Sequence, residues 1–231
     1  MQITEPVTML TDYGLGLLAL LWATRLFVLN RRDRHWSRSL WTIGFVATAA
    51  ASLLGGSFHG FRTHLTELAA AMLWKGSVYS IGVASWSMFS AVIVATFQSP
   101  WRRWLLVAIA AKFLLFATWM STHSEFRFVI FDYGSAMIAI LIAQVHGWLG
   151  RRDQSAAWIT SGVIVGFFAA LIQLSGFAIH RQFNHNDLFH VIQAVSFYLF
   201  YRGGRRLTDR ADLKGTESVS TFQRGESGKP R

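Results

Sequence analysis

Long apolar segments alternate with short polar ones along most of the chain. Each apolar segment is close to 20 residues long, roughly the length at which an α-helix crosses the hydrocarbon core of a bilayer. Proline is nearly absent from these segments, so the backbone hydrogen bonds of a helix can form throughout them. The pattern predicts an all-α membrane protein with seven transmembrane helices. Their expected ranges are 10–30, 40–60, 67–97, 101–120, 126–149, 156–179 and 186–202.

Composition supports a membrane protein and excludes several other classes. Hydrophobic residues make up 52% of the 231 residues and charged residues only 15%, whereas soluble domains carry about a quarter charged residues. The net charge of +10 comes largely from arginines at the ends of apolar segments, which is typical of topology signals rather than of nucleic-acid binding. No nucleic-acid partner is therefore expected. The absence of cysteine excludes disulfides, thiolate nucleophiles and cysteine-ligated metals.

Charged residues in the short connections predict the orientation of the chain. Basic residues gather in alternate connections, which hold Arg31, Arg32, Arg102, Arg103, Arg151 and Arg152. The N-terminus and the other connections are mainly acidic, with Glu5, Asp12, Glu67, Glu125 and Asp187. The positive-inside rule then places the N-terminus outside and the C-terminus in the cytoplasm. Because the N-terminus lacks the basic start of a signal peptide, we expect the first apolar segment to be retained, in a bacterial plasma membrane.

An internal repeat with a period of 120 residues divides the chain into two halves. Asp12-Tyr13-Gly14 recurs as Asp132-Tyr133-Gly134, and Arg31-Arg32-Asp33 recurs as Arg151-Arg152-Asp153. Between residues 12–33 and 132–153, ten of 22 aligned positions are identical. Apolar composition explains the matching Ala and Leu residues, but not two polar motifs in one register. Because an offset of four helices keeps both copies in the same orientation, the repeats are expected to be parallel.

The repeat defines the predicted domain organisation. One transmembrane domain spans 1–206 and consists of repeat 1 at about 10–97, a linker helix at 101–120 and repeat 2 at about 126–202. Residues 207–231 are polar and rich in Gly, Ser, Lys and Glu, so we expect them to form a disordered cytoplasmic tail. A functional site on the axis between two parallel repeats would draw side chains from both halves.

Polar residues that could carry chemistry gather near the predicted outer surface. The stretch from His180 to Gln193 contains three histidines, one aspartate, two asparagines and two glutamines between two apolar segments. Acidic residues also mark the outer starts of four helices, namely Asp12, Glu67, Asp132 and Asp187. Neutral imidazole with carboxylate is a usual ligand set for zinc, so the pattern predicts a metal site. The aspartates would equally serve as helix caps, and Asn184 with Asp187 has the spacing of a capping box.

Two lysines are predicted to lie inside the membrane. Lys75 and Lys112 are each eight or nine residues from the outer end of a helix, roughly 12 Å deep at the helical rise. A charged lysine at that depth requires a partner, and Asp132 and Asp187 are the candidates. In the alternative interpretation, both side chains extend toward the outer surface.

Three short motifs stand at the ends of predicted helices, namely Gly56-Ser57-Phe58-His59, Glu67 and Phe189-His190-Val191. They resemble motifs of the seven-helix superfamily that includes alkaline ceramidases and the progestin and adipoQ receptors. That superfamily has a serine and a histidine at the end of helix 2, an acidic residue near the start of helix 3, and an HxxxH pair opening helix 7. This chain differs in that Ser57 is only two residues before His59, and Asn186 occupies the position four before His190.

The resemblance implies a zinc ion that activates water for the hydrolysis of amide or ester bonds in lipids. The implied metal ligands are His59, His185 and His190, and His180 or an aspartate such as Asp12 would be an alternative third ligand. Asp187 or Asp132 would orient a ligand or accept the proton of the water. Ser57 would help to hold the developing oxyanion. The partner molecules are then membrane lipids, and the substrate would enter from the outer leaflet.

Two other function classes fit the sequence. A parallel arrangement of three, one and three helices is the architecture of small sugar transporters, in which polar side chains near the axis would bind a solute or relay protons. The proline kinks and the Pro-Gln pair expected of such transporters are missing from both repeats. In a non-catalytic sensor or a structural membrane protein, the same polar side chains would instead hydrogen-bond between helices.

Overall fold

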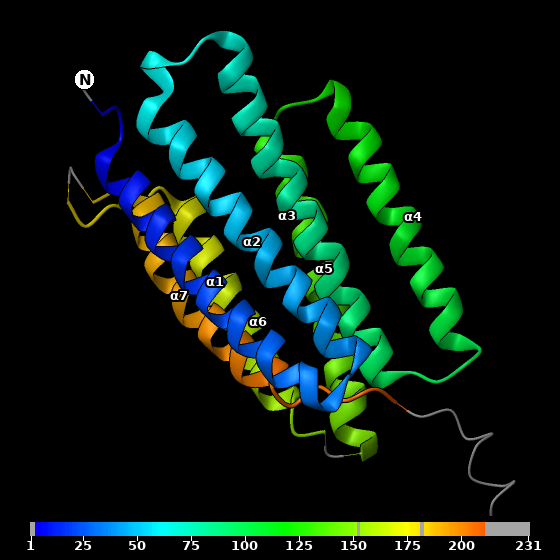
Figure 1. Cartoon of the computed structure of the whole chain (residues 1–231). Helices are drawn as coiled ribbons and strands as arrows, with labels where there is room; N and C mark the ends of the chain where they lie inside the picture. Colours follow the sequence, from blue (N-terminus) through cyan, green and yellow to red (C-terminus); the bar gives the residue numbers. More distant parts are fainter. Residues whose placement is uncertain (1–2, 152, 181–182, 211–231) are drawn as a thin grey trace, which may run out of the picture.

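The computed structural model of the chain describes residues 3–151, 153–180 and 183–210. The disordered tail that we predicted lies, from residue 211 onward, outside the described residues. The described chain is all-helical, with seven α-helices, a single 3-10 turn at Arg62–His64 and no strand, which confirms the all-α part of the predicted fold class (Figure 1). The helices are α1 (Pro6–Asp33), α2 (Trp36–Phe61), α3 (Glu67–Thr96), α4 (Trp101–Thr122), α5 (Phe126–Arg151), α6 (Ala156–Ser175) and α7 (His185–Gly204).

Six of these helices, α1 to α6, are long and apolar enough to cross a membrane. Their outward faces carry large apolar side chains, including Leu17, Leu115 and Phe168, which are 63%, 73% and 57% exposed. Such a surface would aggregate in water but suits the hydrocarbon of a bilayer. Helix α7 is not among these six helices, and its first half contains the polar residues Asp187, His190 and Gln193. These features are those of a multi-pass membrane protein.

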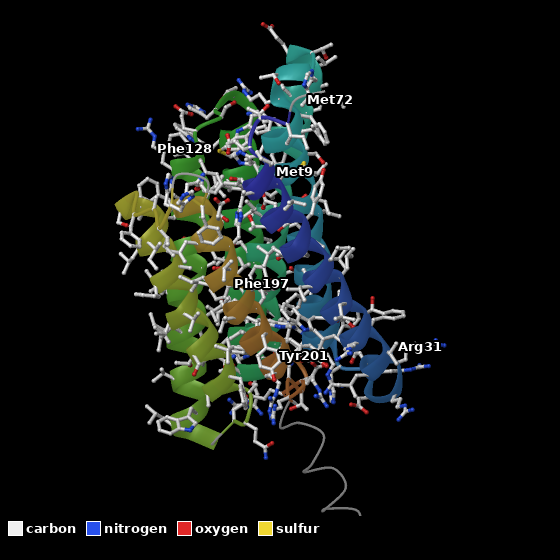
Figure 2. All side chains as sticks on the ribbon, turned by 90° about the vertical axis from the view of Figure 1, so that its left-hand side faces the viewer. Met9, Arg31, Met72, Phe128, Phe197 and Tyr201 are labelled. Atoms are coloured by element: carbon white, nitrogen blue, oxygen red, sulfur yellow. The ribbon has the colours of Figure 1, made fainter. Side chains whose placement is uncertain are left out.

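The helices pack as a ring with one helix outside it (Figure 1). Around the ring, α1 contacts α2, α2 contacts α3, α3 contacts α5, α5 contacts α6, α6 contacts α7, and α7 returns to α1. Helix α4 packs mainly on the outer side of α3. Figure 2 labels Arg31 and Tyr201 near one end of the helices. In that half of the ring, a hydrophobic core that includes Trp41, Phe45 and Phe200 fills the interior.

Helix α6 ends four residues earlier than we predicted. Gly176 follows Ser175 in the left-handed conformation, with φ of 69°, and its N–H bonds to the carbonyl of Gln173. A glycine at this position ends a helix because it adopts positive φ without a steric cost. The prediction that His180 closes this helix is therefore wrong. His180 is exposed in the connection to α7, where its backbone pairs with that of Phe183.

The two membrane lysines attach α4 to the ring in different ways. Lys112 of α4 forms an ion pair with Asp132 of α5, which is one of the two partners that we expected. Lys75 of α3 donates instead to the backbone carbonyls of Met120 and His123 at the end of α4. The prediction that Lys75 pairs with a carboxylate is thus wrong. The unpaired carbonyls at the C-terminus of α4 provide the negative charge instead.

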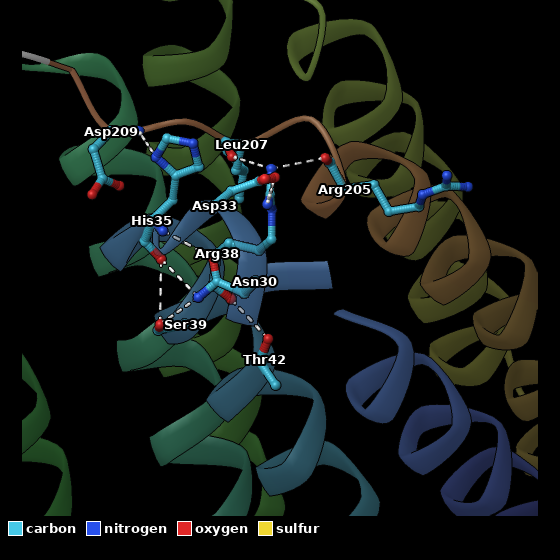
Figure 3. Close-up of polar contacts among 9 residues, drawn as sticks. All are labelled: Asn30, Asp33, His35, Arg38, Ser39, Thr42, Arg205, Leu207 and Asp209. Atoms are coloured by element: carbon cyan, nitrogen blue, oxygen red, sulfur yellow. Dashed lines mark hydrogen bonds and ion pairs between the residues drawn. The ribbon is translucent and has the colours of Figure 1, made fainter. Parts of the chain in front are cut away.

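Residues 205–210, here called the C-terminal strap, cross the ends of α2 and α3 (Figure 3). Arg38 is only 3% exposed and donates to the Asp33 carboxylate at 2.6 Å and to the carbonyls of Arg205 and Leu207 at 3.2 Å. The Asp209 carboxylate accepts the N–H groups of residues 36 and 37 at 2.7 and 2.8 Å, so it caps α2. These hydrogen bonds hold the C-terminal strap, through residue 210, against the ends of α2 and α3.

Replacing Asp209 by alanine is expected to lower the free energy of unfolding by about 1–2 kcal/mol, because the first N–H groups of α2 lose their acceptor. Thermal or denaturant unfolding of the full-length protein in detergent measures this change. The matched control is Thr208→Ala, whose side chain is exposed on the same strap. Equal stability of the two variants would contradict a capping role for Asp209.

Candidate functional site

A buried seam of polar contacts joins the first and last helices of the ring. We define the α1–α7 seam by Thr8, Thr11 and Asp12 of α1 and by Asp187 and His190 of α7. The three α1 residues follow the i, i+3, i+4 spacing of one helix face, and the two α7 residues follow i, i+3. The two helices therefore present these side chains to each other along adjoining faces.

Asp187 fixes the start of α7 and ties it to α1. One carboxylate oxygen accepts the backbone N–H of Asn184 at 2.7 Å, and the Asn184 side chain accepts the N–H of Asp187 in return. The other oxygen accepts the hydroxyl of Thr8 at 2.9 Å, and the residue is 0% exposed. Asp187 thus forms the capping box that the spacing predicted, with both oxygens engaged.

His190 lies between two side chains of α1. Its Nδ1 is 2.9 Å from the Thr11 hydroxyl, and its Nε2 is 3.3 Å from an oxygen of Asp12. The Thr11 hydroxyl also lies within hydrogen-bond distance of the carbonyls of residues 7 and 8, which can only accept. When the hydroxyl donates to a carbonyl, Nδ1 carries the ring proton and Nε2 has a free lone pair. A proton or a cation must then lie between Nε2 and the Asp12 carboxylate, because two lone pairs repel each other.

Gly56 of α2 allows Asp12 to reach this position. A Cβ at residue 56 would lie 2.9 Å from the Cβ of Asp12 and 2.9 Å from the ring of Tyr13, closer than real Cβ atoms approach. Next to it, the Ser57 hydroxyl is 2.9 Å from the Tyr13 hydroxyl and donates to the Leu53 carbonyl at 2.8 Å. Gly56 therefore sets how closely α1 packs on α2 at the seam.

The seam borders a central chamber of about 570 Å³ that is lined by all six helices of the ring. This volume is within the range of roughly 300–1,000 Å³ in which proteins bind small molecules. Most of the lining is apolar, with aromatic side chains from α3, α5, α6 and α7. Its carboxylate, imidazole and amide side chains are Asp12, His59, Gln173, Asn186, His190 and Gln193.

Of the predicted metal ligands, His59 and His190 line the chamber, and Asp12 lines it as well. Nδ1 of His59 is 3.2 Å from the Glu5 carboxylate. His185 is the first residue of α7 and does not line the chamber, and the residue that faces it one turn before His190 is Asn186. A spacing of five residues turns His185 about 140° from His190 around a helix, whereas a spacing of four keeps Asn186 on the same face.

The other predicted site residues lie away from the chamber lining. Ser57 and Asp187 are engaged in the contacts described above, and Glu67 is exposed in the first turn of α3. Asp132, the counterpart of Asp12 in the sequence repeat, bonds to Lys112 beside α4. The same Asp-Tyr-Gly motif therefore has an imidazole partner in one half of the chain and an ammonium partner in the other.

No group of three or more His, Asp or Glu residues within 3–151, 153–180 and 183–210 is arranged to hold a metal ion. The zinc site stays a prediction. The sequence interpretation did not include Thr8, Thr11 and Asn186 as parts of the site. For the two threonines, the i, i+3, i+4 spacing with Asp12 in an otherwise apolar segment is the signal that could have found them.

Membrane-capable helices around an apolar chamber with a buried carboxylate–imidazole contact define a multi-pass helical membrane protein with an internal polar site. A family model matches residues 7–209, and the chain belongs to that family, a family of unknown function (DUF6962). The matched region contains both the α1–α7 seam and the chamber. Comparisons with curated proteins and with solved structures return no match.

Proposed function

We propose that this protein is a metal-dependent hydrolase that cleaves an amide or ester bond in a lipid-like substrate. The observation that carries the proposal is the contact at the edge of an apolar chamber between Asp12 and His190. The distance from Oδ1 of Asp12 to Nε2 of His190 is 3.3 Å. Ionisable side chains inside a membrane domain are costly, so their presence beside a cavity favours a functional role. The resemblance of the motifs around His59 and His190 to those of alkaline ceramidases supports the same reaction class.

The shape of the chamber favours a substrate with an aliphatic chain. Along α7 its lining extends from Asn186 to Phe200, which is roughly 21 Å at the rise of an α-helix. This length exceeds the depth of one leaflet, about half of the 30 Å hydrocarbon core. An aliphatic chain would lie against Leu15, Val163 and Phe197, with its polar bond next to the seam.

The side chains at the polar end have the donor chemistry of a zinc site, namely two imidazoles and one carboxylate. His190 would bind through Nε2 while Thr11 holds Nδ1, the arrangement by which a second hydrogen bond orients a histidine ligand. Asp12 would bind beside it, and His59 would join on leaving Glu5. A zinc ion, when bound, acts as a Lewis acid that activates water and polarises a carbonyl. Asn186 and Gln193 are placed to hydrogen-bond the polar part of the substrate.

The pairing of helices supports the finer topology that we propose, in which two parallel three-helix units are joined by α4. Within the ring, the contacts of α1, α2 and α3 recur as those of α5, α6 and α7, and the two junctions are α3 with α5 and α7 with α1. All seven helices would then cross the membrane. By the positive-inside rule the N-terminus is outside and the C-terminus is in the cytoplasm of a bacterial cell.

The experiment that tests the proposal is to measure zinc and hydrolysis on the same full-length protein, purified in detergent. We expect about one zinc per chain, and release of fatty acid from some members of a panel of N-acyl and O-acyl lipids. Chelation should stop hydrolysis and added zinc should restore it. The matched control is His123→Ala, which removes a half-buried imidazole that stacks on Trp119 and does not line the chamber. Folded protein that binds no zinc and cleaves no lipid of the panel would overturn the proposal.

A ring of two equivalent halves is also the architecture of a small-solute transporter, which is the second candidate. Uptake of solutes into liposomes that contain the protein distinguishes the two functions. Solute flux that persists in His190→Ala, together with an absence of hydrolysis, would favour the transporter.

A further inference from the structure

We propose that Trp158, Arg202 and Arg206 form a site for the phosphate of an anionic phospholipid, here called the α6–α7 basic site. It is separate from the chamber, and it requires only that these helices lie in a membrane. Trp158 is in the first turn of α6, Arg202 is in the last turn of α7, and Arg206 follows α7. All three side chains are half-buried, so each has a face that a lipid can reach.

The two guanidinium groups are held on the same aromatic ring. The Cζ atoms of Arg202 and Arg206 are 4.1 and 5.3 Å from the ring centroid of Trp158, within the range of a cation–π contact. Nη1 of Arg202 also donates to the Tyr198 hydroxyl at 2.9 Å, and Nη1 of Arg206 donates to the Arg202 carbonyl at 2.9 Å. These contacts fix the orientation of both groups and use only part of their five N–H donors.

The charges of this site are not neutralised within the described part of the chain. Arg38 and Arg127 pair with carboxylates, whereas neither Arg202 nor Arg206 pairs with a carboxylate of the described residues. Asp153, the nearest acidic residue in sequence to α6, accepts the backbone N–H and the hydroxyl of Ser155. Two positive groups on one ring repel each other, and an anion between them removes that repulsion.

The position favours a phospholipid as the source of that anion. Tyr201 and Arg31 mark this end of the helices in Figure 2, and tryptophan and arginine at helix ends are typical of the membrane interface. Basic pockets between transmembrane helices bind the head groups of anionic lipids. A guanidinium that is already stacked presents a planar pair of donors that matches two phosphate oxygens.

Native mass spectrometry of the full-length protein with phosphatidylglycerol, and with phosphatidylcholine of the same acyl chains, tests the site. We expect the wild type to retain phosphatidylglycerol preferentially, and the double variant R202Q/R206Q to retain it about tenfold less. The matched control is R31Q/R32Q, which removes the same charge from exposed arginines at the same end of the helices. R202K is expected to be intermediate, because a lysine keeps the charge but loses the planar pair of donors.

Two results would overturn the inference. The first is equal retention of phosphatidylglycerol by the wild type and R202Q/R206Q, or a loss of this lipid in R31Q/R32Q as large as that in R202Q/R206Q. Either result would mean that the general positive charge of the protein attracts the lipid. The second is displacement of phosphatidylglycerol by millimolar inorganic phosphate, which would assign the site to the free anion. If R202Q/R206Q fails to fold, the comparison of R202K with the wild type tests the site instead. An unchanged preference of R202K for phosphatidylglycerol would exclude bidentate recognition of the phosphate by Arg202.

Discussion

His190→Ala is expected to remove bound zinc and to reduce hydrolysis at least about 100-fold. His190 lines the chamber and offers Nε2 to the position beside Asp12, so its loss leaves one imidazole and one carboxylate as donors. Loss of a zinc ligand removes both the metal and the chemistry that depends on it. Zinc content by mass spectrometry and release of fatty acid, both measured on monodisperse protein in detergent, give the two readouts.

The neighbouring residues of α7 provide the controls for this result. His185→Ala should keep its zinc, because His185 does not line the chamber. Asn186→His should bind zinc at least about tenfold more tightly, because it adds an imidazole one turn before His190 on the same face. Loss of zinc in His185→Ala with normal zinc in His190→Ala would reject this assignment and restore the ligand set that the resemblance implied.

Asp132→Asn is expected to lower the free energy of unfolding by about 3 kcal/mol. Asp132 is 7% exposed in its side chain and pairs with Lys112, which is 31% exposed, between α4 and α5. Removing one member of a buried ion pair leaves an uncompensated charge, which costs roughly 3–5 kcal/mol, and the partial exposure of Lys112 favours the lower end. Denaturation of the protein in mixed micelles with increasing SDS measures the change.

The double variant Lys112→Leu/Asp132→Leu separates the cost of a lone charge from the value of the pair. Replacing both members by apolar residues is often neutral, so this variant should recover most of the stability lost in Asp132→Asn. Equal instability of the single and double variants would mean that the pair itself stabilises the attachment of α4. Wild-type stability of Asp132→Asn would show that Lys112 needs no carboxylate.

The apolar pattern predicted the helices well, because length and hydropathy are local properties of the chain. All seven expected segments are helical, and four of the fourteen predicted ends match the structure exactly, namely the starts at Glu67, Trp101, Phe126 and Ala156. The largest errors are of four residues, and one of them is at Gly176, where a single residue in the left-handed conformation ends α6. A glycine inside an apolar segment is compatible with either helix or helix end, so the sequence alone favoured continuation.

The candidate site was predicted only in part, because partners depend on which faces meet. Two identical Asp-Tyr-Gly motifs give no reason to expect that Asp12 contacts an imidazole while Asp132 contacts a lysine. The difference comes from α4, which supplies Lys112 to one half of the chain and has no counterpart in the other. Similarly, Lys75 binds helix carbonyls rather than a carboxylate, since the end of α4 happens to lie beside it.

The α1–α7 seam joins two helices that are far apart in the sequence. During synthesis, Thr8 and Thr11 on the polar face of α1 are made 179 residues before their partners Asp187 and His190. Until α7 is made, these side chains have no partner from that helix. A chain that ends before α7 therefore leaves the Asp12 carboxylate without its imidazole partner, and an unpaired ionisable group inside a membrane domain is costly.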